Sequence, residues 1–377
     1  GVASTSTDMT TGSTESTGVA TDVAISGSGF FVVTGGTEGE YQYTREGDFS
    51  VDADGNLTVN GYKVCGWLQH TTDSDGNAVY DTNGKVEALN IYSDAYNGNK
   101  KIMAAKATAE ATFSGNLPST AEVASTATAL NAIGTTPTSY DKTTDVTCYD
   151  SQGNSHTVTV SWKKCYVDST DADNPVTSWY WSASAADGST ISPSEGYVKF
   201  DKNGAIITTD SSYSTTPSIA VTPSAGTGTS AFNVKLDFST LSQNTSTSKI
   251  TATADGYTAG ELQSFSISSD GTIIGSYSNN QTQALCKICL ATFTNPQGLK
   301  KSGDNLYVTS ANSGTVSYVS AGEGGTSSLS TGCLEMSNVD LASQFSRMMI
   351  SQRAYQANSK VLSTSDQMLE TIINVIR

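Results

Sequence analysis

The hydrophobic and polar positions of this chain follow two different periods, and the change between them falls close to the C-terminus. Up to about residue 336, apolar residues come in short runs or alternate with polar ones, as in "HTVTVSW" (His156–Trp162) and "LCKICLATF" (Leu285–Phe293). Successive side chains of a strand point to opposite faces, so this alternation predicts β-structure. From Ser337 to Arg377 the apolar spacing lengthens to that of a helix, without Pro or Gly.

One turn phrase recurs between the predicted strands. It combines Asp or Asn with Gly, residues that adopt the backbone angles of tight reversals, and so predicts hairpin turns. The copies are "DADGNL" (Asp52–Leu57), "DSDGNA" (Asp73–Ala78), "DTNGKV" (Asp81–Val86), "DSQGNS" (Asp150–Ser155), "DKNGAI" (Asp201–Ile206) and "SDGTII" (Ser269–Ile274). Two copies resemble the start of a calcium loop, but Gly stands fourth rather than sixth, and the twelfth positions are Lys63 and Gly84. Turns are therefore favoured over metal sites.

The C-terminal segment predicts one long assembly helix. Apolar residues follow one another at intervals of three, four or seven positions, the pattern of a helix that packs on other helices. The apolar members of this seam are Leu341, Phe345, Met348, Tyr355, Leu362, Leu369, Ile373 and Ile376, and polar residues stand between them at Gln352, Ser359 and Asp366. Ser337 or Asn338 is the expected cap. The partner helix lies either in a missing N-terminal segment or in neighbouring subunits; the alternative is a helix folded back on the chain's own sheet.

Composition divides the chain into four parts. We expect residues 1–116 and 255–336 to form one discontinuous inner β domain, and residues 117–254 to form a second, inserted β domain. The middle is Ser/Thr-rich and holds Trp162, Trp179 and Trp181. Residues 337–377 are the helix. A simple row of domains along the chain is the alternative.

The charge balance excludes several partners. The 20 Lys and Arg against 36 Asp and Glu leave a net charge of −16, which argues against nucleic acid and against an anionic membrane surface. No apolar run is long enough to cross a bilayer, and the first residues show no Sec-type signal. Because the sequence opens with Gly1 rather than Met, we expect that a segment precedes it.

No catalytic, cofactor-binding or metal-binding constellation is recognisable, so we do not expect an enzyme. His70 and His156 both stand in strand-like phrases without a nucleophile motif. Cys286 and Cys289 form a CxxC inside a predicted strand, where residues three apart face opposite sides. The six cysteines permit disulfides, but their irregular spacing favours reduced thiols.

Cys148 stands six residues after Lys142 at the start of the predicted insert. A thiol close to a lysine can have a lowered pKa and react readily. The alternative is a small apolar residue that fills a strand interior, as buried cysteines commonly do.

Several long phrases resemble the bacterial flagellar hook protein family. They occur in collinear order and cover both ends of the chain and the start of the insert. The phrases are "GVATDVAISGSGFFVV" (Gly18–Val33), "MAAKATAEATFSGNLP" (Met103–Pro118), "TCYDSQGNSHTVTVSW" (Thr147–Trp162), "GELQSFSISSDGTIIGSYSNNQTQAL" (Gly260–Leu285), "ATFTNPQGLKKSGDNLYVTSANSG" (Ala291–Gly314) and the segment Leu334–Arg377.

The resemblance implies a structural subunit that polymerises with itself into a flexible, curved tube carrying torque from rod to filament. It implies a mainly β fold with an inserted β domain, and a C-terminal helix that packs in a helical tube. Rod and hook–filament junction proteins at the tube's ends and a hook cap during assembly are the implied partners. The implied location is the extracellular hook, reached through the flagellar type III route, and no cofactor is implied.

Two alternatives remain beside the hook subunit. The phrases "SNVDL" and "QRAYQAN" near the C-terminus also occur in the related distal rod proteins, which usually lack so large an insert. A secreted adhesin or surface-layer β protein would explain the composition but not the helical seam. Some spirochaete members of the family form Cys–Lys cross-links between subunits, which makes Cys148, with Lys142 or a lysine of another subunit, the position to test.

Overall fold

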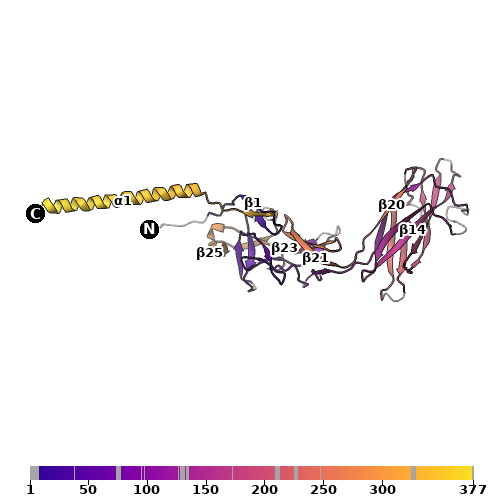
Figure 1. The fold of residues 1–377 in the computed structure, drawn as a ribbon, viewed down its shortest axis with the longest axis horizontal. Helices are drawn as coiled ribbons and strands as arrows, with labels where there is room; N and C mark the ends of the chain where they lie inside the picture. The colour runs from indigo at the N-terminus through magenta and orange to yellow at the C-terminus, as the bar shows by residue number, and fades with distance from the viewer. Residues whose placement is uncertain are drawn as a thin grey trace. The chain divides into compact units, whose positions relative to one another are not determined.

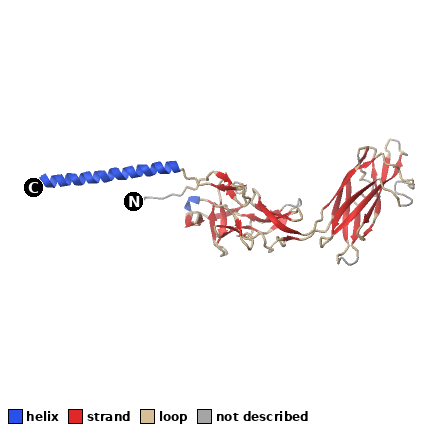
Figure 2. Cartoon of the chain, viewed as in Figure 1, coloured by secondary structure: helices blue, strands red, loops and turns tan. Residues whose placement is uncertain are grey.

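The chain is mainly β, with a single long helix near its C-terminus in the part that the structure describes (Figure 2). This confirms the predicted fold class. The computed structural model describes residues 8–375 except 38, 74–77, 95, 97, 126, 128–131, 133–135, 172, 209–212, 225–227, 247 and 324–327. None of the described helices is long and apolar enough to cross a bilayer.

The chain folds as two compact units. The first unit combines three separate segments, Gly1–Tyr92, Ser266–Ile274 and Ala284–Arg377. The second unit combines Ser93–Phe265 with Gly275–Gln283. The finer division of the chain at residues 117 and 254 stays a prediction.

The first unit contains mostly short strands, one 3₁₀ turn and the helix. They are β1 (Thr14–Ser16), β2 (Val23–Ile25), β3 (Phe30–Thr34), β4 (Tyr41–Thr44), β5 (Ser50–Val51), β6 (Leu57–Val59), β7 (Tyr62–Trp67), β8 (His70–Thr72), β9 (Ala78–Tyr80), β10 (Glu87–Ala88), β24 (Leu290–Phe293), η1 (Pro296–Gly298), β25 (Lys300–Gly303), β26 (Leu306–Val308), β27 (Val316–Val319), β28 (Leu329–Thr331), β29 (Cys333–Glu335) and α1 (Leu341–Val375). Strands β21 (Gly260–Ile267), β22 (Thr272–Tyr277) and β23 (Thr282–Ile288) have residues in both units.

The core of the first unit surrounds β3, whose five residues are all buried. One edge of β3 pairs with β4, and the other pairs with β7 and β24. A strand buried on both faces reads as a continuous apolar run, which explains the unalternating "FFVV" of this segment. Phe30 packs edge-on against Phe293, with 5.9 Å between the ring centroids.

The second unit is built from longer strands in two sheets, and Figure 1 shows β14 and β20 in its two layers. One sheet has the order β13-β14-β15-β17 and the other β16-β18-β19-β12-β20. The strands of this unit are β11 (Ile102–Met103), β12 (Glu110–Pro118), β13 (Lys142–Tyr149), β14 (Ser155–Asp168), β15 (Val176–Ala185), β16 (Thr190–Ser192), β17 (Glu195–Phe200), β18 (Ser218–Thr222), β19 (Phe232–Asn244) and β20 (Lys249–Ala254).

Phe238 of β19 lies at the centre of the core between these sheets. Its ring packs edge-on against Trp162 at 4.8 Å, Phe113 at 5.2 Å and Trp181 at 5.7 Å, all four being buried. These partners come from both sheets, and aromatic pairs of this geometry add to the stability that burial provides. The tryptophan-rich middle of the sequence therefore forms one closed core.

The chain enters and leaves this sandwich on neighbouring strands. β12 pairs antiparallel with β20, and Ala111 lies opposite Ala254. On its other edge β12 pairs parallel with β19, with Glu110 opposite Lys235. The entering strand is thus held between two strands that follow it by more than a hundred residues.

The recurring Asp–Gly phrase forms one kind of turn. In the turn between β13 and β14, the carboxylate of Asp150 accepts hydrogen bonds from the backbone N–H groups of Gln152 and Asn154, both at 2.9 Å. Gly153 has a φ of +87°, a region that glycine enters without steric cost. The hairpin prediction is confirmed for Asp150–Ser155 and for Asp52–Leu57, which joins β5 to β6. It is wrong for Asp81–Val86, because β10 pairs with β7 rather than with β9.

Candidate assembly surface and buried polar cluster

The described residues of α1 leave their apolar side chains in solvent. The predicted seam is exposed throughout: Leu341 66%, Phe345 57%, Met348 51%, Tyr355 78%, Leu362 71%, Leu369 56% and Ile373 66%. Ile376 lies outside the described residues. The helix therefore does not fold back on the chain's own sheets in this structure, and the seam stays a prediction for an assembly surface.

The apolar surface of α1 is broader than the predicted seam. Five further apolar side chains are more than half exposed: Met349, Ile350, Val361, Met368 and Ile372. Val361 and Met368 each precede a seam residue, so they form a second row next to it. Two adjacent rows allow one helix to contact more than one neighbouring helix.

Asp340 caps the helix, not Ser337 or Asn338 as the sequence suggested. Its carboxylate accepts hydrogen bonds from the backbone N–H groups of Ala342 at 2.9 Å and Ser343 at 3.2 Å. Asn338 instead donates its side-chain amide to the carbonyl of Thr10. Aspartate is as good a cap as asparagine and its charge also suits the helix dipole, so composition alone could not rank the candidates.

An ion pair holds β29, the strand that precedes α1, within the first unit. Glu335 of β29 lies 2.9 Å from the Arg45 Nε, with 12% and 18% of the two side chains exposed. Arg45 also donates to the carbonyl of Gly27, and Glu335 accepts from the backbone N–H of Gly12. β29 pairs with β1, so residues from both ends of the described chain meet here. No local sequence pattern indicated this contact.

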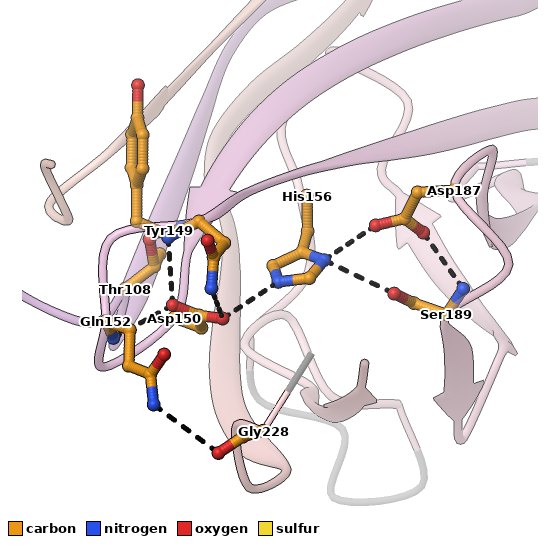
Figure 3. Close-up of polar contacts among 9 residues, drawn as sticks. Thr108, Tyr149, Asp150, Gln152, His156, Asp187, Ser189 and Gly228 are labelled. Carbon is orange, nitrogen blue, oxygen red and sulfur yellow. Dashed lines mark hydrogen bonds and ion pairs between the residues drawn. The ribbon is translucent and has the colours of Figure 1, made fainter. Parts of the chain in front are cut away.

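A buried polar cluster surrounds His156 in the second unit (Figure 3). Its Nδ1 lies 2.6 Å from the Asp187 Oδ2 and 3.3 Å from the Ser189 hydroxyl, while its Nε2 lies 3.3 Å from the Asp150 Oδ2. The ring is almost fully buried, and Phe232 of β19 lies 5.7 Å from it. Both carboxyl groups have a lowered pKa, which favours the ionised form near neutral pH. Burial opposes ionisation, but hydrogen bonds outweigh it: Asn154, Gln152 and His156 hold the pKa of Asp150 well below its usual range, and Ser189 and His156 lower that of Asp187.

The cluster is not arranged for nucleophilic catalysis. In a Ser–His–Asp triad the serine and the aspartate occupy opposite ring nitrogens. Here Ser189 and Asp187 share Nδ1, and an aspartate rather than a nucleophile faces Nε2. Across the residues that the structure describes, no three His, Cys, Asp or Glu side chains form a group that could hold a metal ion. Sequence reasoning missed this cluster, although "DSQGNSH" places His156 just after the turn that begins with Asp150.

Cys148 and Lys142 lie on the same strand, β13, but not side by side. Six residues of strand separate their Cα atoms by about 20 Å. Cys148 is fully buried, and burial together with the charge of Asp255 raises its pKa to about 12. Lys142 donates to the carbonyl of Ser248 at 3.4 Å. A bond between these two residues of one chain is therefore out of reach, and a cross-link from Cys148 to another subunit stays a prediction that requires β13 to open.

The six cysteines form no disulfide in the structure, and five of them are buried. The sixth, Cys333, is partly exposed on β29. Burial raises the pKa of Cys65 to about 12. It also raises the pKa of Cys289. Reduced thiols, favoured from the irregular spacing, are what the structure contains.

Most of the chain matches known families of flagellar proteins. Residues 24–94 match the family described as "Flagellar hook protein FlgE/F/G D1 domain", and residues 116–257 match "Flagellar basal body protein FlaE D2 domain". Residues 330–375 match "Flagellar basal body rod FlgEFG protein C-terminal".

Individual relatives give the same grouping. The flagellar hook protein FlgE of Escherichia coli is 33% identical over 378 residues, covering 99% of this chain and 87% of the relative. The flagellar basal-body rod protein FlgG of Bacillus subtilis is 47% identical, but over 31% of this chain and 45% of its own length. A crystal structure of Helicobacter pylori flagellar hook protein FlgE2 covers 80% of this chain and 95% of its own, with a TM-score of 0.54 at 15% identity, so it supports the fold alone.

Proposed function

This chain belongs to the flagellar hook protein FlgE family and is a structural subunit of the hook, and from that premise we propose that its copies polymerise through α1 into the flexible, curved tube that carries torque from rod to filament. It acts as a structural protein rather than an enzyme. It resides in the flagellum, where rod and junction proteins meet the ends of the tube and a cap accompanies assembly. Export through the flagellar type III route belongs to the same proposal.

The exposed apolar stripe of α1 is the observation that carries this proposal. Seven described seam residues are each at least half exposed. Fully burying one large apolar side chain contributes roughly 1.5–3 kcal/mol, so burying the stripe contributes on the order of 10 kcal/mol per helix before the cost of ordering. A lone helix of this kind is marginal in water. Helices of neighbouring copies supply the missing contacts.

The hook is favoured over the rod because of coverage. The hook relative from Escherichia coli aligns with 99% of this chain, whereas the rod relative from Bacillus subtilis aligns with 31%. Residues 116–257, which lie within the second unit, match a flagellar domain family of their own. An adhesin or surface-layer protein is not supported by any of these matches.

A charge placed on the stripe tests the proposal in the bacterium that makes this protein. We expect Leu362→Glu with Leu369→Glu to abolish hooks counted by electron microscopy, because two carboxylates would have to be buried between helices. The control pair is Thr364→Glu with Thr371→Glu, which puts the same charges on the opposite face and leaves hooks intact. Normal hooks in the Leu362/Leu369 variant would refute assembly through this stripe. Straight tubes from the unmodified chain would move the assignment to the rod.

A further inference from the structure

His156 sits between two ionised carboxylates, and this placement dictates its charge. An ionised carboxylate accepts hydrogen bonds but cannot donate them. A neutral imidazole has one N–H and one lone pair, so one of its nitrogens would face a carboxylate oxygen without a proton between them. Both contacts, 2.6 Å to Asp187 and 3.3 Å to Asp150, are satisfied only when both ring nitrogens carry protons. The geometry therefore fits a charged imidazolium.

The groups around the ring are few and come from three elements. From the β13–β14 turn Asp150 faces Nε2, and from the β15–β16 turn Asp187 and Ser189 face Nδ1. From β19 Phe232 covers the ring. Among the described residues with a printed contact to the ring, Asp150 and Asp187 carry charge, so the ring proton determines whether these three side chains hold one net negative charge or two.

The cluster lies next to the segments that lead into β12 and out of β20, the strands on which the chain enters and leaves the sandwich. The backbone of Tyr149, next to Asp150, makes two hydrogen bonds with Thr108. Its N–H donates to the Thr108 hydroxyl at 2.8 Å, and its carbonyl accepts from the Thr108 N–H at 2.9 Å. Gly153 of the same turn lies so close to the entering and leaving segments that an added Cβ would be 2.9 Å from the Ala105 Cβ and 3.2 Å from the Thr258 hydroxyl. The position of the Asp150 turn and the course of both segments are therefore linked.

We propose that His156 is a protonation-dependent clasp: with both nitrogens protonated it joins the β13–β14 and β15–β16 turns, and on losing one proton it releases the β13–β14 turn and loosens the segments that lead into β12 and out of β20. The remaining proton stays on Nδ1, because the contact with Asp187 is shorter and Ser189 lies there too. Nε2 then presents a lone pair to Asp150, and the two repel each other.

The direction of the pH dependence follows from the three groups. The pKa of Asp150 and that of Asp187 are lowered, because hydrogen bonds outweigh burial, so their contribution is present above the ordinary aspartate value near 4 and is lost as pH falls through the lowered values. The contribution of the ring proton is present at low pH and is lost as pH rises and the ring discharges. The clasp is therefore complete only at pH values where both aspartates are ionised and both ring nitrogens carry protons.

The chain offers a simple test because it contains two histidines, His70 and His156. In ¹⁵N-histidine NMR of the full chain, we expect a pH range in which both nitrogens of His156 show the protonated signature, and above it a range in which one of them does not. Hydrogen exchange read by mass spectrometry reports the turn. When the ring discharges, protection of the Gln152–Asn154 amides should fall roughly ten- to hundredfold, the range expected for losing one charged hydrogen bond.

Two variants make the test specific. His156→Gln should remove the pH-dependent change in protection, whereas the control His70→Gln should keep it. If His156→Gln fails to fold, which tryptophan fluorescence of the buried core would show, Asp187→Asn takes its place. It removes one of the two carboxylates that the doubly protonated ring joins, so a singly protonated ring can keep its contact with Asp150 and the pH-dependent change in protection should shrink. A singly protonated His156 ring at every pH, or equal pH profiles in the wild type and in the folded His156 variant, would overturn the clasp. Neither result bears on assembly through α1, which is tested separately.

Discussion

The second unit buries most of its large apolar side chains, whereas α1 leaves its large apolar side chains exposed. In the second unit Phe238 is fully buried among rings from both sheets, whereas on α1 Tyr355 is 78% exposed. Both segments carry regular apolar patterns, one with the period of a strand and one with that of a helix. The comparison teaches that a sequence pattern specifies which face needs to be buried, but not whether the same chain provides the cover. The second unit buries its apolar face within itself, whereas the described part of this chain leaves the apolar side chains of α1 exposed.

The largest effect on stability is expected at the centre of the core between the two sheets of the second unit. Phe238→Ala removes a ring that contacts Trp162, Phe113 and Trp181, and it should lower the free energy of unfolding by about 3–5 kcal/mol, because a large cavity is left between the sheets. Urea unfolding followed by tryptophan fluorescence measures this.

Phe345→Ala is the matched control on α1, since it makes the same truncation at a side chain that is 57% exposed. It should leave the stability of the isolated chain unchanged and reduce assembly instead. Equal losses in the isolated chain for both variants would contradict the contrast between a covered and an uncovered pattern.

A smaller effect is expected where the core has no spare room. Gly196 lies opposite Trp181 on the neighbouring strand, and an added Cβ would be 2.8 Å from the indole. Gly196→Ala and Gly196→Val should destabilise the second unit in increasing order, by about 1–3 kcal/mol, because the ring must move in a packed core. The same urea titration gives the values, and no difference between the two substitutions would mean that the ring moves aside freely.

The smallest effect concerns the start of the uncovered helix. Asp340→Ala removes the cap and should cost about 1 kcal/mol of helix stability, seen as lower helicity by circular dichroism in the unassembled chain. Asp366→Ala removes a charge from the middle of the same helix and serves as the control, with helicity kept or slightly raised. In the assembled tube the cap variant should regain its helix, because burial of the stripe then outweighs the loss. A deficit that persists after assembly would show that α1 stays uncovered in the polymer.

The sequence predicted local features well because they rest on local chemistry. The mainly β character, the long C-terminal helix and the turn at Asp150–Ser155 all follow from residues next to one another. The parallel pairing of β12 with β19 could not be foreseen, because Glu110 and Lys235 are far apart in the sequence and nothing in either strand identifies the other. The turn at Asp81–Val86 failed as a hairpin for the same reason, since a turn phrase does not say which strand the chain joins next.

The candidate site divides along the same line. The seam of α1 was readable because helical periodicity is repeated over many turns, and the start of the helix was misplaced because Ser337, Asn338 and Asp340 are all good caps. The His156 cluster depends on Asp187, which arrives from a different hairpin. Asp187 lies 31 positions after His156, so their contact leaves no periodic signal in the sequence.

The neighbouring positions of Ala111 and Ala254 have a consequence for how such a chain varies. Because β12 and β20 lie side by side, the residues between them join the rest of the chain at two neighbouring points. Residues inserted or removed between these two strands change the distance between Ala111 and Ala254 very little. The length of the chain between β12 and β20 is therefore free to vary, since an insertion or deletion there leaves both ends of the segment where they are.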